Sequence, residues 1–179
     1  MTDNHPLKVL KYCPKCGSDR FIPSGDRSLK CGACCFHYFI KSSAAVAALV
    51  TDHQNRLMLV TRGVEPDYGK LDLPGGFIDP METAEDAVKR ELKEELGLKV
   101  TKLNYLFSAP NEYEFSDFKV FTLDMAFRVE VETTDNLKAM DDILDYRFYA
   151  EEELDYDDIP APSINRFVRR YFKELKMND

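Results

Sequence analysis

The sequence predicts an α+β protein, in which strands sandwiched by helices follow a small cysteine-rich segment. Three observations lead to this prediction. All five cysteines lie in the first 42 residues. Residues 120–132 alternate apolar and polar side chains, as a strand with one face on a core does. Two later segments, which begin near residues 83 and 163, space their apolar residues as helices do.

Length and composition are those of an ordinary globular protein. The 179 residues are enough for one domain with a core and a small appendage. The longest apolar run, AAVAALV at 44–50, is too short to cross a membrane. The start, MTDNHPLKVL, lacks the basic and then apolar pattern of a signal peptide. We therefore expect a cytoplasmic protein without a membrane partner.

The charge is acidic on average but unevenly distributed. The formal net charge of −8 argues against a protein that coats nucleic acid, so nucleic acid is not expected as a partner. Residues 1–42 carry seven Lys or Arg and three Asp, a net charge of +4. The rest of the chain holds 17 basic and 29 acidic residues, a net charge of −12. Composition thus predicts one domain over 1–41 and another over 42–179.

The N-terminal cysteines form two C-x2-C pairs, Cys13/Cys16 and Cys31/Cys34, with fourteen residues between them. This spacing is typical of a zinc site with four thiolate ligands, which leaves no open position and is therefore structural. Disulfides and free thiols are the alternatives, and Cys35 can replace Cys34 as a ligand. The segment resembles a zinc ribbon, whose apolar residues are expected to close over the ion: Phe21, Phe36, Tyr38 and Phe39.

In the main domain, residues 44–63 predict two strands around a polar turn at 52–56. A loop rich in Gly and Pro follows over 63–80. The next segment predicts a helix that starts at Glu82 or Thr83 and ends at Gly97, since glycine is favoured just after a helix.

The C-terminal half predicts a long strand, a short strand and a helix. The apolar side chains of residues 120–132 are expected on a core and the polar ones outside. A shorter strand is expected over 146–149. Ser163 is expected to cap a helix, whose apolar side chains recur at helical spacing: Ile164, Phe167, Val168, Tyr171, Phe172 and Leu175.

Three glutamates crowd the end of the first predicted helix. Glu91, Glu94 and Glu95 fall within one arc of the helix, at the border of its apolar face. Like charges at this spacing repel, and carboxylates in the last turn also meet the negative end of the helix dipole. A bound divalent cation removes both penalties, and carboxylate oxygens suit Mg²⁺ or Mn²⁺.

The segment Gly76-x5-Glu82-x7-Arg90-Glu91-Leu92-Lys93-Glu94-Glu95-Leu96-Gly97-Leu98 resembles the Nudix box at every fixed position. The resemblance covers most of residues 42–173 and implies an α/β/α sandwich. It also implies an enzyme that cleaves a pyrophosphate bond in a nucleoside diphosphate linked to a second moiety. Leu71 is one departure, because many members of the family carry Trp there.

The resemblance also implies roles for individual residues. Glu91, Glu94 and Glu95 are expected to hold Mg²⁺ or Mn²⁺, and Arg90 is expected to orient these carboxylates. Gly75 and Gly76 are expected to bring the loop backbone close to metal or substrate, and Glu82 to fix the loop against the helix. A box glutamate or Asp142 is expected to serve as the base; Asp142 is otherwise a plain solvated acid.

The substrate is less clearly indicated. A zinc ribbon ahead of a Nudix domain resembles the NADH pyrophosphatase group. That group carries Ser-Gln-Pro-Trp-Pro-Phe-Pro after the box, whereas residues 108–115 here read SAPNEYEF and the chain has no Trp. ADP-ribose, NADH, dinucleoside polyphosphates and sugar nucleotides all stay candidates. Tyr113 and Phe115 are expected either to stack on a base or to pack at a strand edge.

A function of another class is the alternative. The basic ribbon predicts a nucleic-acid or protein contact if the second domain serves as a nucleotide-sensing scaffold rather than an enzyme. The intact set of three helix glutamates favours the enzyme. Self-association into a homodimer stays open.

Overall fold

The computed structural model describes residues 2–135 and 137–178, which divide into two compact units. One unit holds the residues up to Ser42 together with Tyr113–Phe121. The other holds Ser43–Glu112 and the residues from Thr122 onward. The predicted domain boundary after residue 41 stays a prediction.

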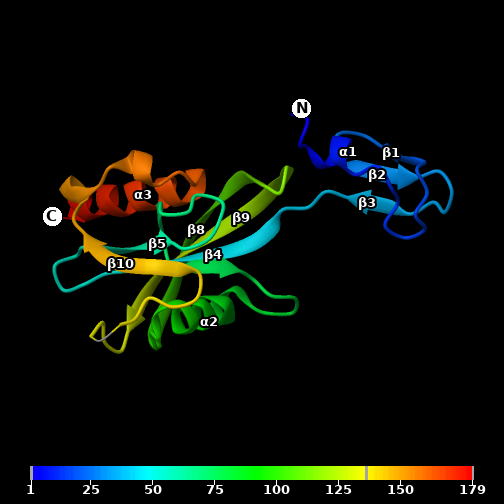
Figure 1. Ribbon diagram of the computed structural model, residues 1–179. Coiled ribbons are helices and arrows are strands. Elements are labelled where there is room, and N and C mark those ends of the chain that lie inside the picture. The colour runs from blue at the N-terminus through cyan, green and yellow to red at the C-terminus, as the bar shows by residue number, and fades with distance from the viewer. Residues whose placement is uncertain (1, 136, 179) are drawn as a thin grey trace. The chain divides into compact units, whose positions relative to one another are not determined.

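The N-terminal unit is a short helix and a small antiparallel sheet (Figure 1). The helix α1 spans Pro6–Val9, and the strands are β1 (Phe21–Pro23), β2 (Ser28–Cys31) and β3 (His37–Phe39), in the order β1-β2-β3. The buried side chains gather on one side of this sheet: Leu7, Cys13, Phe21, Leu29 and Cys31.

The predicted aromatic cover over the metal is only partly correct. Phe21 is buried and Phe36 packs against the same cluster. Tyr38 and Phe39 are exposed, so the prediction is wrong for these two residues. They lie on β3, an edge strand of the small sheet, and all three residues of this strand are exposed.

The second unit is built around β4 (Ser43–Val50), which pairs in parallel with β9. One sheet has the order β7-β4-β9-β8 and the other β10-β5-β6. The remaining strands are β5 (Leu57–Arg62), β6 (Leu71–Asp72), β7 (Gly75–Phe77), β8 (Val100–Phe115), β9 (Phe118–Val131) and β10 (Ile143–Tyr149). The helices are α2 (Ala84–Leu96) and α3 (Pro162–Asn178), with short 3-10 turns at Glu151–Glu153 and Tyr156–Asp158.

Successive residues of β4 face opposite helices. Val46, Ala48 and Val50 pack in one core cluster with the apolar face of α2. Ala47 and Leu49 pack in the other cluster, with α3. The helices therefore cover opposite faces of the strands (Figure 1). This arrangement confirms the predicted α/β/α sandwich.

The ends of α2 follow from local chemistry. The side chain of Thr83 accepts a hydrogen bond from the Asp86 amide, 3.2 Å away, so Thr83 rather than Glu82 caps the helix. Gly97 has φ 69°, a left-handed conformation that costs glycine little. Its amide donates to the Lys93 carbonyl over 3.0 Å and closes the last turn, as predicted.

Two other predictions need correction, and one strand was not predicted. The expected loop over 63–80 contains β6 and β7, and the long strand β8 was not predicted. On β9, the polar residues Thr122 and Asp124 are buried while Leu123 is exposed. The single-face prediction is therefore wrong for residues 122–124, where β9 lies next to β4 and α3 covers Asp124. It holds for the rest of the predicted strand, where Phe127 and Val129 are in the core and the polar residues at 128, 130 and 132 are exposed.

The cap predicted for the last helix is also wrong. α3 begins at Pro162, because proline tolerates the first helical position, where the missing N–H has no partner to lose. Ser163 lies within the first turn, and its hydroxyl donates to the buried carboxylate of Asp124 instead of capping the helix. The predicted apolar face of α3 is confirmed in the core.

Candidate functional site

The helix α2 presents three carboxylates along one edge of its buried face. Glu94 is the most exposed, with 48 % of its side chain accessible, whereas the Glu91 side chain is 13 % accessible. Glu95 lies deepest, with 6 % of the residue exposed. The three acids thus form a gradient from solvent to core, in the positions that the helical spacing predicts.

Arg90 holds the exposed part of this cluster together. Its Nη1 atom donates to Oε1 of Glu91 over 2.7 Å and to Oε2 of Glu94 over 3.1 Å. Its Nε and Nη2 atoms each donate to a carboxylate oxygen of Glu82 over 2.9 Å. Nη2 also donates to the Phe77 carbonyl over 2.9 Å, which ties the loop before α2 to the helix. One guanidinium therefore serves three carboxylates and one backbone carbonyl.

The environment separates the acidities of these groups. Hydrogen bonds from Arg90 lower the pKa of Glu82. Burial raises the pKa of Glu91 even though Arg90 stabilises its charged form. The surrounding glutamates raise the pKa of Arg90 itself.

Glu95 has the most perturbed acidity of the three glutamates. Burial, together with the negative charges of Glu91, Asp72 and Asp141, raises its pKa to about 8. A hydrogen bond from the Gly75 amide, 3.0 Å from Oε2, only partly offsets these effects. Around neutral pH, Glu95 therefore keeps its proton unless a cation comes close.

Two glycines let the loop backbone approach these carboxylates. A Cβ at Gly75 would lie 2.2 Å from the Val46 carbonyl oxygen, and the residue has φ 145°. A Cβ at Gly76 would lie 2.5 Å from Oε1 of Glu91. No side chain fits at either position without a shift. The predicted approach of Gly75 and Gly76 to metal or substrate stays a prediction.

The donor set suits a divalent cation. Glu91 and Glu94 share the Arg90 guanidinium with Glu82. Glu95, the deepest acid, accepts a hydrogen bond from the neutral Gly75 amide. Hard oxygen ligands in excess of positive charge are what Mg²⁺ and Mn²⁺ bind. Arg90 and Gly75 hold the oxygens in their present positions, so the described residues do not gather them into a ready-made ligand group here. Ion binding would require these carboxylates to turn.

Asp142, Tyr113 and Phe115 are the remaining predicted site residues. Asp142 is exposed at the turn before β10, where its carbonyl accepts from the Gly63 amide over 2.7 Å. Its neighbour Asp141 is the acid whose charge acts on Glu95. Tyr113 and Phe115 belong to the other compact unit. Their roles in the site stay predictions.

Sequence reasoning missed a second polar group, on β6, β8 and β9. Asp124 is buried and accepts from Ser163, and Asp72 pairs with Arg62 over 2.7 Å. The hydroxyl of Thr122 and the side-chain carbonyl of Asn111 are buried without a hydrogen-bond partner among the described residues. Asp72 and Asp124 are also close enough that the charge of Asp124 raises the pKa of Asp72, which burial raises most.

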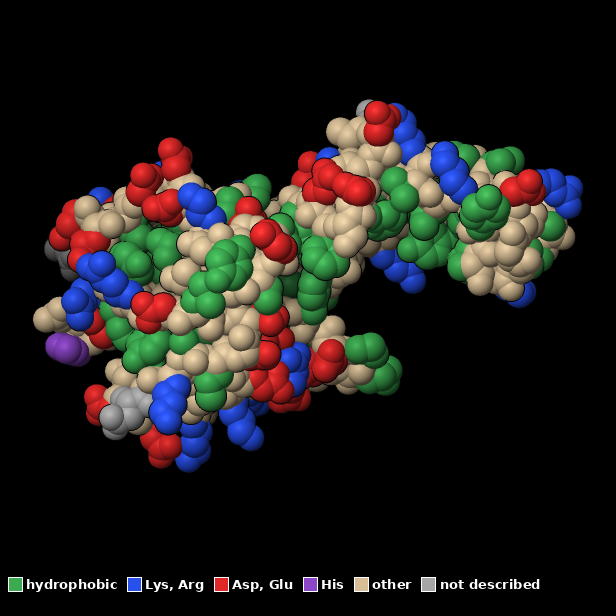
Figure 2. Space-filling view, viewed as in Figure 1, with side chains coloured by type: hydrophobic (Ala, Val, Ile, Leu, Met, Phe, Trp, Pro, Cys, Tyr) green, Lys and Arg blue, Asp and Glu red, His purple; other side chains and the backbone are tan. Residues whose placement is uncertain are grey.

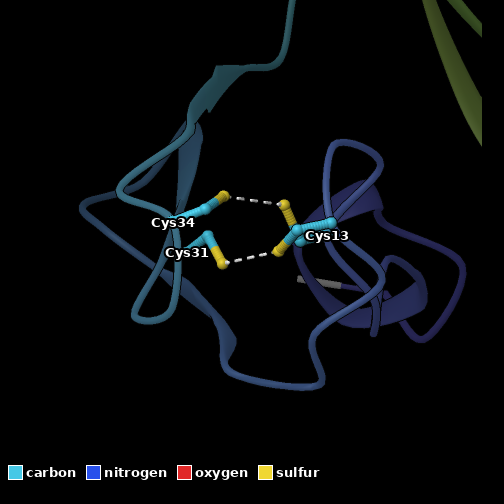
Figure 3. Close-up of side chains that lie close together, drawn as sticks. Cys13, Cys31 and Cys34 are labelled. Carbon is cyan, nitrogen blue, oxygen red and sulfur yellow. Dashed lines mark hydrogen bonds between the residues drawn. The ribbon is translucent and has the colours of Figure 1, made fainter.

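In the N-terminal unit, four cysteine sulfurs converge (Figure 3). Cys13, Cys16, Cys31 and Cys34 place their sulfurs within 4.8 Å of one another. Two of the sulfur pairs, Cys13–Cys34 and Cys16–Cys31, are 3.7 Å apart. A tetrahedral ion with Zn–S bonds of about 2.3 Å separates its sulfurs by about 3.8 Å, so the group has the dimensions of a zinc site.

The backbone favours the thiolate form of one member of this group, Cys31. Amide hydrogen bonds from Cys34 and Ala33 lower the pKa of Cys31 to about 6 despite its burial. Cys35 is exposed, with φ 60°, and is not a member of the group. The arrangement thus brings together the set with Cys34 rather than the alternative with Cys35.

Comparison with known proteins agrees with this geometry. The family model for the NUDIX domain matches residues 41–172. The NAD-capped RNA hydrolase NudC of Deinococcus radiodurans is 31% identical over 128 residues, covering 65% of this chain and 42% of that protein. The same-named protein of Stutzerimonas stutzeri is 26% identical over 165 residues, covering 92% and 55%. The chain spans about half the length of the curated relatives it matches.

Solved structures share the fold. A NUDIX hydrolase from Nitrosomonas europaea superimposes with a TM-score of 0.69 at 25% identity, covering 92% of both chains. The NUDIX domain of Shewanella oneidensis NrtR, solved with ADP-ribose, has a TM-score of 0.58 at 19% identity and covers 79% of this chain and 91% of that one. Among the described residues, no helix combines the length and apolar character needed to cross a membrane.

Proposed function

Because the chain belongs to the NUDIX domain family, we propose that it hydrolyses a pyrophosphate bond in a nucleoside diphosphate linked to a second moiety. The observation that carries this proposal is the set of three glutamates on α2, graded from exposed to buried, of which Arg90 binds the two outer ones. A solvated acidic helix needs neither the buried Glu95 nor a glycine, Gly76, packed against the carboxylate of Glu91.

Each residue of the cluster has a distinct role in this proposal. Glu91, Glu94 and Glu95 would hold Mg²⁺ or Mn²⁺, which when bound neutralises phosphate charge and makes water more acidic. Arg90 and Glu82 fix the loop before α2, and Arg90 also orients two of the carboxylates. Asp142 is the proposed base from the later loop, on a turn whose backbone is anchored to Gly63.

The buried polar atoms on β8 and β9 support a substrate that carries hydrogen-bonding groups. An unpartnered buried hydroxyl or amide carbonyl costs about 1–3 kcal/mol, and such groups in native proteins commonly serve a function. We propose that Thr122 and Asn111 offer these atoms to the nucleoside part of the substrate. Asp124 and Ser163 satisfy each other and would shape the same surface.

Among the substrate candidates, the similarity to proteins named NAD-capped RNA hydrolase favours an NAD-type dinucleotide. The chain has no Trp, and its segment 108–115 differs from the motif of the NADH pyrophosphatase group. ADP-ribose, dinucleoside polyphosphates and sugar nucleotides therefore remain candidate substrates. A structural Zn²⁺ at the four cysteines is part of the proposal and takes no part in the chemistry.

A substrate panel tests the proposal. NADH, ADP-ribose, dinucleoside polyphosphates, sugar nucleotides and nucleoside triphosphates are each incubated with Mg²⁺ or Mn²⁺, and the products are identified by chromatography. We expect cleavage at the pyrophosphate for at least one substrate, and loss of turnover by orders of magnitude in Glu94→Gln. Lys93→Gln, which changes an exposed residue on the same turn of α2, is the matched control. Metal-independent turnover, or full activity in Glu94→Gln, would refute the site.

A further inference from the structure

The outward face of the N-terminal sheet combines apolar and basic side chains. Cross-strand pairing aligns Ile22, Lys30 and His37 across all three strands, and Ser28 with Phe39 beside them. Ile22 is 61% exposed and Phe39 49% exposed, although both are apolar. The opposite face carries the core and two of the four clustered cysteines. This outward face, defined here by Arg20, Ile22, Lys30, His37 and Phe39, is called the ribbon platform.

The aromatic part of the platform is held in place. The rings of His37 and Phe39 lie 4.3 Å apart, tilted by 35°. His37 Nε2 lies 3.0 Å from the hydroxyl of Ser28, which is itself buried and fixes the imidazole against β2. Because two neighbouring flat rings are already ordered on an exposed sheet, a third planar group can stack there at a low cost in conformational entropy.

The charged side chains of the platform are all basic. Arg20 continues the outward face of β1 and stands opposite Gly32, whose amide donates to its carbonyl over 2.8 Å. Arg20 and Lys30 are exposed, and no Asp or Glu stands at an outward position of β1, β2 or β3. Four thiolates around Zn²⁺ would reduce the +4 charge of residues 1–42 to about +2. Figure 2 shows apolar and basic side chains next to each other on this unit.

We propose that the ribbon platform binds single-stranded RNA, with a base stacked on the Phe39 and His37 rings and phosphates beside Arg20 and Lys30. Single-stranded nucleic acid is bound by such a combination of exposed aromatic rings and cations on a sheet. A protein partner is favoured less, because its interface would bury Lys30 at the centre of the apolar residues without a carboxylate from this face. The inference stands on this unit alone and goes beyond the proposed hydrolysis.

The test uses the full chain and an RNA without a pyrophosphate bond, which the proposed hydrolysis cannot cleave. A 5′-hydroxyl oligouridine of roughly a dozen nucleotides, labelled at its 3′ end, is titrated with protein in fluorescence anisotropy at several salt concentrations. We expect saturable binding that weakens with salt. Phe39→Ala should weaken it by about 5- to 150-fold, the range for loss of one stacked base. Lys30→Gln should lower the slope of log affinity against log salt by about 0.7.

Matched controls come from the same unit. Tyr12→Ala removes an aromatic side chain that is exposed but off the sheet, and Lys15→Gln removes an exposed cation between two of the cysteines. Both should bind RNA like the unchanged chain, and the zinc content of all variants confirms that the unit is folded. Glu94→Gln should also bind normally, so a failure of the proposed hydrolysis stays distinguishable.

Three outcomes would overturn the proposal. One is absence of salt-dependent RNA binding by the unchanged chain. Another is equal weakening by the platform variants and their controls. The third is competition by linear polyphosphate, or binding to anionic phospholipid vesicles, as strong as RNA binding and insensitive to Phe39→Ala, which would show a general polyanion surface without stacking.

Discussion

Gly76 lies against the carboxylate of Glu91, so that a Cβ at residue 76 would stand 2.5 Å from Oε1 and 2.8 Å from Cδ of that side chain. Its neighbour Gly75 meets backbone instead, with a virtual Cβ 2.2 Å from the Val46 carbonyl oxygen. Two adjacent glycines are thus required for different reasons. One leaves room for a carboxylate and the other for a strand.

These two contacts predict different effects of a Gly→Ala substitution at each position. Gly76→Ala should fold normally, because a side-chain end can yield, but should require about 10- to 100-fold more Mg²⁺ for half-maximal turnover. Gly75→Ala meets rigid backbone at a positive φ and should lose at least about 1–3 kcal/mol of stability. Thermal melts and Mg²⁺ titrations of both variants check this. Equal loss of stability in both would show that the Glu91 contact is not the constraint at residue 76.

The pKa of Glu95 predicts how stability without divalent metal depends on pH. The folded value of about 8 lies above the ordinary value of 4.5, so between these values the folded state binds more protons than the unfolded state. The free energy of unfolding should therefore fall as pH rises from about 5 to 8 and level off above 8. Melts of the Mg²⁺-free protein at several pH values measure this.

Two controls isolate the contribution of Glu95. Glu95→Gln should flatten the decline between pH 5 and 8, and added Mg²⁺ should restore stability to the unchanged chain at pH 8 but not to the variant. The raised pKa of Glu91 acts in the same direction, so a residual slope is expected. A stability that rises over this pH range would contradict the burial of Glu95 as a carboxylic acid.

Removal of the unpartnered hydroxyl of Thr122 should affect protein stability and substrate binding differently. Thr122→Val keeps the shape and removes a buried polar atom, so the melting temperature should stay level or rise. If the hydroxyl contacts substrate, KM should rise several-fold while kcat changes little. Steady-state kinetics and melts decide this, with the exposed Thr101→Val as control. A lower melting temperature with an unchanged KM would assign Thr122 a purely structural role.

The cysteine geometry predicts which thiols bind metal. The purified protein should contain about one zinc per chain, and Cys35→Ser should retain it. Cys34→Ser should lose it, because the Cys34 sulfur lies 3.7 Å from that of Cys13. Elemental analysis of the two variants gives a direct comparison. Retention of zinc by Cys34→Ser and its loss from Cys35→Ser would assign the fourth ligand to Cys35.

The sequence was most informative where the determinants are local. The cap at Thr83, the left-handed Gly97 and the three glutamates are all fixed within one helix, so spacing alone predicts their arrangement. The four cysteines are likewise set by two tight turns. Local contacts of this kind need no knowledge of which strands pair.

Features that depend on pairing across the chain were missed. Ser163 and Asp124 are 39 residues apart, and nothing near either residue indicates that the serine turns away from its own helix end. The alternation of β9 predicts one solvent-exposed face, which is correct over 125–132. It does not reveal that Thr122 and Asp124 are buried on that face. The proposed contact of Thr122 and Asn111 with substrate likewise rests on their burial in β9 and β8, neighbouring strands of one sheet, which spacing along the chain does not indicate.

The alternation of β4 between the two helices has a consequence for how this unit opens. Val46, Ala48 and Val50 support α2, and the intervening Ala47 and Leu49 support α3, so neither helix can detach without uncovering a strand that the other still needs. Amide protons of both helices should therefore exchange with solvent through one shared, cooperative opening rather than two separate ones. A substitution under α3, such as Leu49→Ala, should loosen the helix that carries the three glutamates as well.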